Sequence, residues 1–410
     1  MVAKINLWIK NRYQKVLNSI AFYPAFIGLL FLIVSFFVIQ FDYSDAGKDI
    51  KSRFDYLTLK DASTARAIIS AIAAGILSLT VFSFSMVMIV LNQAASQMSN
   101  RVLDKLIGNR FQQVVLGIYI GTIVYALFLL STIRDIDAGI YIPAISTYLL
   151  ILITIFDIFL FIYFLHYITQ SVKYKVIIER IYNDTKKSLE DSCKLRKEPA
   201  KAALFESDHV VKSTAPGIYT GFDKRALVKI CREHDCCVFM IHTPGTFVLE
   251  GVPLFKLNKQ LPGDAKDDIL KSMYIDNDES IDQNFFFGFR QLSEVAVKAL
   301  SPGINDPGTA IESLRALFRL YAYRVSFFPD SIIVDEDSNP RIILQELTYE
   351  KIFADTLLPI WDYGKNDRMI QKELFHLLTQ LQVIHPNTLS TKFILEVKHK
   401  MQQQTPLIDY

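Results

Sequence analysis

Small and polar side chains without a fixed charge recur along one face of a long apolar segment, Ala67–Leu91. The segment is long enough to cross a bilayer, which takes about 20 mostly apolar residues. At about 3.6 residues per turn, the positions in the following set share one side of a helix. This set, the polar stripe, comprises Ser70, Ala74, Ser78, Val81, Ser85, Met88 and Asn92, and the pattern continues to Ser96 and Ser99.

The chemistry open to the polar stripe is contact with water or with an ion. Hydroxyl and amide groups can replace part of an ion's hydration shell, and apolar side chains between them can close a pore by excluding water. Small residues equally favour close packing between helices. Two hypotheses therefore stay open, packing within the four-helix unit or a pore shared by several copies. The candidate pore-lining residues are Ser70, Ser78, Val81, Ser85, Met88 and Asn92, with Val81 and Met88 as the narrow points.

Two ionisable residues fall in the last apolar segment. Asp157 is near its middle, where a carboxylate costs about 2.5–3.5 kcal/mol even on lenient insertion scales. It must be neutral, hydrogen-bonded or next to water, and Thr122 and Tyr125 are the expected partners. Asp157 is thus either an ion or proton site or a protonated acid bonded to a neighbouring helix. His166 is near the end of the segment, where contact with lipid headgroups is expected.

Four apolar segments must position these residues. The chain has 410 residues, 51% of them hydrophobic, and the apolar excess precedes residue 170. Basic residues without acidic neighbours occupy the N-terminal arm, and basic residues also dominate the second loop. The positive-inside rule therefore places both termini in the cytoplasm, although the first loop weakens this assignment. The expected spans are Ile20–Phe41, Ala67–Leu91, Val114–Ile133 and Ser146–Ile168.

The remaining chain resembles a soluble protein. A charged, helix-compatible stretch is expected to extend the fourth span as a stalk, short alternating runs predict strands, and a 3.6-residue period predicts helices further on. The glycine-flanked run at 244–257 predicts a hairpin of a small barrel-like domain. The expected organisation is an arm (1–19), a four-helix membrane domain (20–170), a helical stalk (171–202), a β-rich domain (203–262) and a helical domain (263–410). The fold class is thus an α-helical membrane domain followed by a cytoplasmic α+β region.

Several classes of chemistry have no support in the sequence. The net charge of +2 indicates no nucleic-acid partner. No nucleotide-binding loop, nucleophile elbow or zinc-protease helix is present, so we expect neither an enzyme nor a cofactor. Cys231, Cys236 and Cys237 are spaced poorly for zinc, and no metal site is expected. In the expected topology all cysteines face a reducing compartment, so disulfides are not expected.

A turn between two predicted helices carries Ser301, Asn305 and Asp306, with Arg290 one helix earlier. Asp306 suits a helix N-cap and Pro307 the first helical position. The turn is thus either a capping device or a binding site for an ion or small anion at a helix N-terminus.

This turn also carries a family resemblance. The run Ala299–Ala310 resembles the "ALSP-x-x-NDP-x-TA" signature of a bacterial family of predicted membrane proteins of unknown function. The runs FGFRQLSEVA, Phe82–Leu103 and Phe164–Val172 resemble other parts of the same family. The resemblance implies four spans followed by a cytoplasmic region, and it implies no reaction, cofactor or ligand.

The sequence leads to two hypotheses of function. The first is a homo-oligomeric ion channel of the bacterial inner membrane, lined by the second span and regulated by the cytoplasmic domain. The alternative is a membrane-anchored sensor or scaffold whose cytoplasmic domain binds a ligand or a protein. The expected partners are the lipid bilayer, further copies of the chain and ions.

Overall fold

The computed structural model describes residues 21–53, 59, 61–97, 110–133, 142–171, 173–196 and 209–403, with only the backbone for 93–97. The chain divides into two compact units, Met1–Lys173 and Tyr174–Tyr410. The expected N-terminal arm, most of the second loop and the side chains of Ser96 and Ser99 lie outside the described residues.

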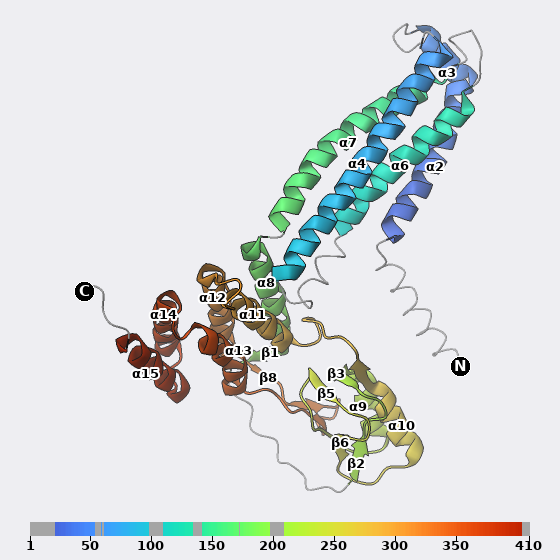
Figure 1. Cartoon of the computed structure of the whole chain (residues 1–410). Helices are drawn as coiled ribbons and strands as arrows, with labels where there is room; N and C mark the ends of the chain where they lie inside the picture. Colours follow the sequence, from blue (N-terminus) through green and yellow to red (C-terminus); the bar gives the residue numbers. More distant parts are fainter. Residues whose placement is uncertain are drawn as a thin grey trace. The chain divides into compact units, whose positions relative to one another are not determined.

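The first unit contains four helices that are long and apolar enough to cross a membrane, as the sequence predicts (Figure 1). Each is predominantly apolar, and a helix satisfies its backbone hydrogen bonds internally in lipid. A short polar helix, α3 (Asp45–Arg53), follows the first span. The spanning helices are α2 (Phe22–Tyr43), α4 (Ala62–Gln97), α6 (Arg110–Thr132) and α7 (Ala144–Ser171).

Two glycines one helical turn apart set the approach of α6 to α2. A Cβ atom on Gly117 would lie 2.7 Å from the side chain of Ile27, and one on Gly121 would lie 2.6 Å from the ring of Phe31. Small residues at this spacing let spanning helices pack closely where no hydrophobic force between helices operates. The position of α6 is therefore fixed by the pair Gly117 and Gly121.

The second unit begins with α8 (Tyr174–Ser192), which packs against α11 (Phe285–Ala299) and α12 (Pro307–Arg324). Most of its apolar residues, including Ile177, Ile181 and Leu189, are buried, whereas Val176 is exposed. Gly288 of α11 makes this packing possible, because a Cβ atom there would overlap Thr185 of α8. The segment expected to be a stalk is thus part of the core of the second unit, because its apolar face is covered by two helices.

The strands form open sheets, so the expected barrel-like domain is not found. One sheet has the order β2-β6-β4-β10-β9, a second has β5-β3-β7, and β1 pairs with β8. The predicted hairpin is also wrong, because β5 pairs with β3 whereas β6 pairs with β2 and β4. The strands are β1 (Cys193–Leu195), β2 (His209–Lys212), β3 (Gly217–Phe222), β4 (Val238–Met240), β5 (Thr246–Val248), β6 (Pro253–Leu257), β7 (Met273–Asp276), β8 (Phe328–Pro329), β9 (Ile332–Val334) and β10 (Pro340–Ile343).

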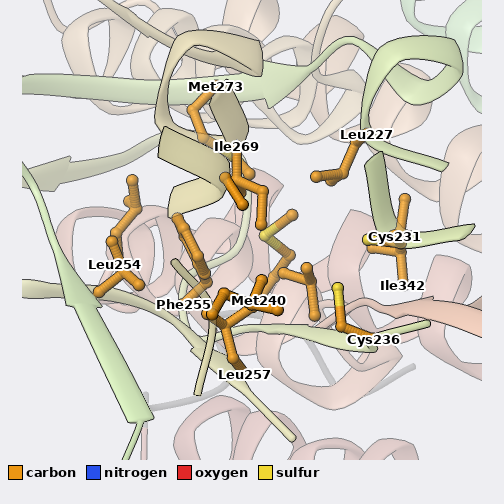
Figure 2. Packing of buried hydrophobic residues seen from close by; sticks show 14 of the residues in the cluster. Leu227, Cys231, Cys236, Met240, Leu254, Phe255, Leu257, Ile269, Met273 and Ile342 are labelled. Atoms are coloured by element: carbon orange, nitrogen blue, oxygen red, sulfur yellow. The ribbon is translucent and has the colours of Figure 1, made fainter. Parts of the chain in front are cut away.

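Two short helices, α9 (Lys224–Glu233) and α10 (Gly263–Ser272), contribute to the core of the five-stranded sheet. Leu227 and Cys231 of α9 lie near Met240 and Ile342 of the sheet, and Ile269 of α10 joins the same cluster (Figure 2). β10 lies parallel to β4 although about a hundred residues separate them in sequence. Residues from the region expected to be helical therefore complete the sheet.

Three further helices follow, as the 3.6-residue period predicts for this part of the chain. They are α13 (Tyr349–Gly364), α14 (Arg368–Ile384) and α15 (Thr388–Gln402). Their N-caps are Thr348, Asp367 and Asn387, whose side chains accept hydrogen bonds from backbone amides of the first turn. Such caps satisfy donors that have no partner within the helix.

Candidate functional site

The polar stripe lies on the outside of the first unit. All seven of its residues are exposed, whereas Ile69, Ile76 and Val87 on the opposite side of α4 are buried. No described residue of this chain covers the stripe, so packing within the chain's own four helices does not explain it. A second copy, lipid or water must meet this face.

The exposed face of α4 is not uniformly polar. Phe82 and Ile89 are also exposed on it, with 51% and 61% of their surface accessible. The hydroxyl of Ser85 donates to the carbonyl of Val81 at 2.9 Å, so this serine can face an apolar medium without an unpaired donor. The stripe residues Ser70 and Ala74, which precede Ser78, have smaller side chains than most of those after it. A Cβ atom on the adjacent Gly75 would meet no atom within 4 Å.

The inner side of α4 contributes to a second polar group, which the sequence revealed only in part. Asp157 of α7 is completely buried, and neither of its carboxylate oxygens accepts a hydrogen bond from a described residue. Thr122 of α6 lies beside it, as expected, but the Thr122 hydroxyl donates to the Ile118 carbonyl at 3.0 Å. Asp157 is therefore a buried acid without a donor.

Two further hydroxyls complete this group. Tyr119 of α6 and Ser83 of α4 are completely buried, and neither hydroxyl has a hydrogen-bond partner of normal geometry. They lie next to each other, and Asp157 is within electrostatic range of Tyr119. Asp157, Thr122, Tyr119 and Ser83 form what we call the Asp157 cluster. Tyr119 precedes Thr122 by three residues on the same helix face, which is the sequence signal that could have revealed it.

Apolar residues surround the Asp157 cluster. Ile76, Val87, Val115 and Phe164 are buried together with Tyr119 in one hydrophobic core of the first unit. Phe164 lies two turns from Asp157 on the same side of α7. Because apolar surroundings weaken the screening of charge, an ionised group here interacts strongly with any ligand that reaches it.

Tyr125, the other expected partner of Asp157, belongs to a different polar group. Its hydroxyl donates to the Ser146 carbonyl at 3.2 Å, and the Ser146 amide donates to Asp42 at 2.7 Å. Asp42 also forms a completely buried ion pair with Lys51 at 2.8 Å. The Lys51 ammonium further donates to the carbonyls of Asp42 and Ile142, at 3.0 and 3.1 Å. We call Asp42, Lys51, Tyr125 and Ser146 the Asp42 lock. Its carboxylate, ammonium and tyrosine hydroxyl each have a partner, whereas the Ser146 hydroxyl has none among the described residues.

The structure does not bring the other sequence candidates into one site. His166 is exposed in the last turns of α7. Asp306 is the N-cap of α12, accepting from the Thr309 amide at 3.1 Å and from its hydroxyl at 2.6 Å. Ser301 donates to the Lys298 carbonyl, and Asn305 adopts a left-handed backbone conformation with φ 49°. The turn thus has the capping geometry that its sequence predicts.

Arg290 does not join the turn. It forms an ion pair with Glu279 and lies over the rings of Phe286 and Phe287, 5.5 Å from each centroid. These contacts place it in the first half of α11, whereas the turn follows the end of that helix. The candidate anion site of the sequence therefore lacks its expected cation.

The second unit contains a cavity of about 470 Å³ between the end of α8 and β8–β10. Charged residues of both signs line it, among them Asp191, Lys194, Lys224 and Glu346. Burial raises the pKa of Glu346 to about 7, an effect that nearby Arg324 partly offsets. The cavity can therefore hold a small polar ligand and contains an acid that titrates near neutral pH.

Comparison with known proteins identifies the family. The family model described as "Predicted membrane protein (DUF2254)" matches residues 17–380, which include all four spanning helices. The chain belongs to this family. An uncharacterized protein of Mycobacterium bovis and one of Mycobacterium tuberculosis are each 24% identical to it over 329 residues.

These relatives are longer than the chain. The alignments cover 77% of this chain and 63% of each relative, so the chain spans less than two thirds of their length. No solved structure matches the chain. The family description implies membrane association and names no ligand, reaction or partner.

Proposed function

We propose that several copies of this chain assemble in a bacterial inner membrane with their α4 helices around a shared axis, along which ions pass. The observation that carries the proposal is the exposure of the polar stripe on the side of α4 opposite its buried face. Closed rings of identical subunits are the common form of membrane and soluble homo-oligomers. A ring would place Ser78 and Ser85 toward water and would cover the small residues before them.

The spacing of the stripe supports this arrangement. Ser70, Ser78 and Ser85 recur at intervals of about two turns. Val81, between Ser78 and Ser85, and Met88, between Ser85 and Asn92, would form apolar collars. An apolar collar can stop ion flow by dewetting when the pore narrows slightly. A small rotation or shift of α4 would therefore suffice to open or close the pathway.

The proposed orientation has both termini in the cytoplasm. The basic arm and second loop support it through the positive-inside rule. Lys51 of the first loop is buried and paired with Asp42, so one of the basic residues that weaken the assignment is neutralised inside the helix bundle. The second unit would then be cytoplasmic, where it could bind a regulator.

Disulfide cross-linking tests whether the stripe faces another copy. Ser78→Cys should form cross-linked dimers in membranes after mild oxidation, because equivalent residues approach around the axis. The matched control is Phe84→Cys, which is also exposed on α4 but lies to one side of the stripe. Cys237, the least buried native cysteine, should first be replaced by Ser. Equal cross-linking of both variants, or none of Ser78→Cys, would contradict the proposed axis.

Ion flux tests conduction itself. Purified full-length protein in liposomes should release trapped ions, and the double variant Ser78→Leu and Ser85→Leu should abolish the flux by filling the pathway with side chains. Phe84→Leu should leave the flux intact. If the pure protein conducts nothing under voltage, membrane tension and changes of pH, the channel is excluded.

The cavity in the second unit favours a second candidate, a membrane-anchored sensor or scaffold. A pocket lined by charged residues of both signs is suited to a small polar ligand. The two functions separate in a deletion strain. If the Ser78→Leu and Ser85→Leu chain restores the wild-type phenotype fully, the membrane helices act as an anchor. If it fails while Phe84→Leu succeeds, the pathway is required.

A further inference from the structure

We propose that the Asp157 cluster binds one sodium ion inside each copy of the chain, between α4, α6 and α7. The inference does not depend on the proposed pore, because all four residues belong to one subunit and face away from the polar stripe. It assigns a ligand to a group of buried polar side chains of which only Thr122 makes a hydrogen bond of normal geometry in the described structure.

The oxygen atoms of the cluster have the chemistry of a ligand set for a hard cation. Neither carboxylate oxygen of Asp157 and neither hydroxyl of Ser83 and Tyr119 has a hydrogen-bond partner of normal geometry among the described residues. The Thr122 hydroxyl donates its hydrogen bond to the Ile118 carbonyl, so only its oxygen lone pairs remain for a ligand beside Asp157. Buried polar groups in native proteins are almost always satisfied, so this concentration of orphaned oxygens requires a partner.

The charge of the cluster selects a monovalent ion. Asp157 is its single acid, and one sodium ion would balance it completely. Calcium and magnesium sites are built with several carboxylates or with a phosphate ligand. Among the described residues no three His, Cys, Asp or Glu side chains are grouped to hold a metal. The other completely buried acid of the described first unit, Asp42, already pairs with Lys51.

A proton satisfies the cluster less completely than a metal ion. A proton on Asp157 would neutralise one carboxylate oxygen and supply one donor. A proton links only two oxygens at a time, so it would not bring oxygens of all three helices to one centre. A sodium ion accepts lone pairs from several oxygens at once and can therefore engage residues from all three helices.

The position of Ser83 gives the bound ion a structural consequence. Ser83 lies on the inner side of α4, and its neighbours Phe82 and Ser85 are exposed on the outer side. An ion held by Ser83, Thr122 and Asp157 would tie α4 to α6 and α7. Its release would remove that tie, while the apolar residues around the cluster would keep the helices packed.

Thermal unfolding of the full-length protein in detergent tests binding directly. Sodium chloride should raise the midpoint temperature relative to choline chloride at equal ionic strength, with a saturable dependence on concentration, because a ligand that binds only the folded state stabilises it. Asp157→Asn should abolish the sodium effect, and Ser83→Ala should shift it to higher concentration. The matched control is Ser85→Ala, two residues along α4, which should respond like the wild type.

Carbodiimide labelling gives an independent readout that does not depend on unfolding. Dicyclohexylcarbodiimide should modify Asp157 in apolar surroundings, detected by mass spectrometry of the peptide. Sodium at ten times its dissociation constant should slow this modification about tenfold, because only the empty fraction reacts. Choline should have no effect.

Three outcomes would overturn the inference. The first is a sodium-induced stabilisation that survives Asp157→Asn. The second is the absence of any sodium effect on both unfolding and labelling. The third is labelling that responds to pH and is insensitive to sodium, which would show that Asp157 binds protons only. None of these results bears on ion flux, so the cluster and the proposed pore can fail separately.

Discussion

Asp42 and Asp157 are both completely buried in the membrane-spanning unit, and they differ in their partners. Asp42 receives hydrogen bonds from Lys51 and from the Ser146 amide, at 2.8 and 2.7 Å. Asp157 receives none. Burial alone therefore does not show whether a carboxylate has hydrogen-bond donors around it. The two carboxylates differ in the hydrogen-bond donors that lie around them.

Helix α6 contributes residues to the groups around both acids. Tyr125 reaches toward the Asp42 lock through Ser146, whereas Tyr119 and Thr122 face Asp157. The same helix thus has one tyrosine with a hydrogen bond and one without. Substitutions on α6 and in the two clusters can therefore separate a satisfied site from an unsatisfied one within one folded unit.

The largest effect is expected at the Asp42 lock. Lys51→Met should lower the free energy of unfolding by about 3–5 kcal/mol, because it leaves a buried carboxylate without its counter-charge. Denaturant titration in detergent micelles gives the measurement. Lys48→Met is the control, since Lys48 pairs with the fully exposed Asp45 and should cost less than about 1 kcal/mol. Similar losses for both variants would remove the distinction between the buried and the exposed pair.

The next largest loss of unfolding free energy is expected from a change in the packing of α6 against α2. Gly121→Ala should cost about 1–3 kcal/mol, because its Cβ atom would overlap the ring of Phe31. It should also weaken the sodium response, since Tyr119 and Thr122 would move with the helix. Gly75→Ala is the matched control, because its Cβ atom meets no described atom. A Gly121→Ala protein as stable as the control would show that the close approach of α2 and α6 is not required.

A smaller effect should distinguish the two tyrosines. Tyr125→Phe removes a buried hydrogen bond and should cost about 1 kcal/mol. Tyr119→Phe in sodium-free choline buffer should cost close to nothing, because its hydroxyl makes no hydrogen bond to lose. In saturating sodium Tyr119→Phe should become the more damaging of the two. Equal costs in both buffers would contradict the contrast between the clusters.

The smallest change in the free energy of unfolding is expected at Glu346, a partly buried acid outside the spans. Its pKa in the folded protein is about 7, above the ordinary value of 4.5, so folding favours the protonated form. The corresponding stability should be complete below pH 4.5 and should decline as the pH rises through 7. Because Glu346 is partly exposed, we expect a change of less than about 1 kcal/mol.

Unfolding of the second unit, followed by Trp361 fluorescence at pH 5 and pH 8, measures this change. Glu346→Gln should remove the difference between the two conditions. A decline of equal size in the Glu346→Gln protein would assign the pH dependence to other groups.

Local patterns in the sequence predicted the helices well. The four spans were predicted from apolar runs of about 20 residues, the length at which a helix crosses a bilayer with its backbone groups satisfied internally. The N-cap at Asp306 followed from its side chain and from Pro307, because capping depends on neighbours within one turn.

Long-range arrangements were predicted less well. Periodicity defined the polar stripe but could not decide which face of α4 is covered, because this depends on α6 and α7. Thr122 was correctly placed beside Asp157, whereas Tyr125 points toward Ser146, and Ser83 and Tyr119 were missed. The barrel and the hairpin failed because β10, distant in sequence, pairs with β4 and completes the sheet.

The Asp42 lock also constrains the order of biosynthesis. Asp42 and Lys51 belong to the first loop and its flanks, yet their partners Ile142 and Ser146 lie at the start of the last span, with 104 residues between Asp42 and Ser146. At a synthesis rate of about 5–20 residues per second, this separation amounts to roughly 5–20 s. During that interval Asp42 and Lys51 can pair only with each other, because Ile142 and Ser146 have not yet been synthesised. Insertion of the fourth span therefore completes the hydrogen bonds of the first loop.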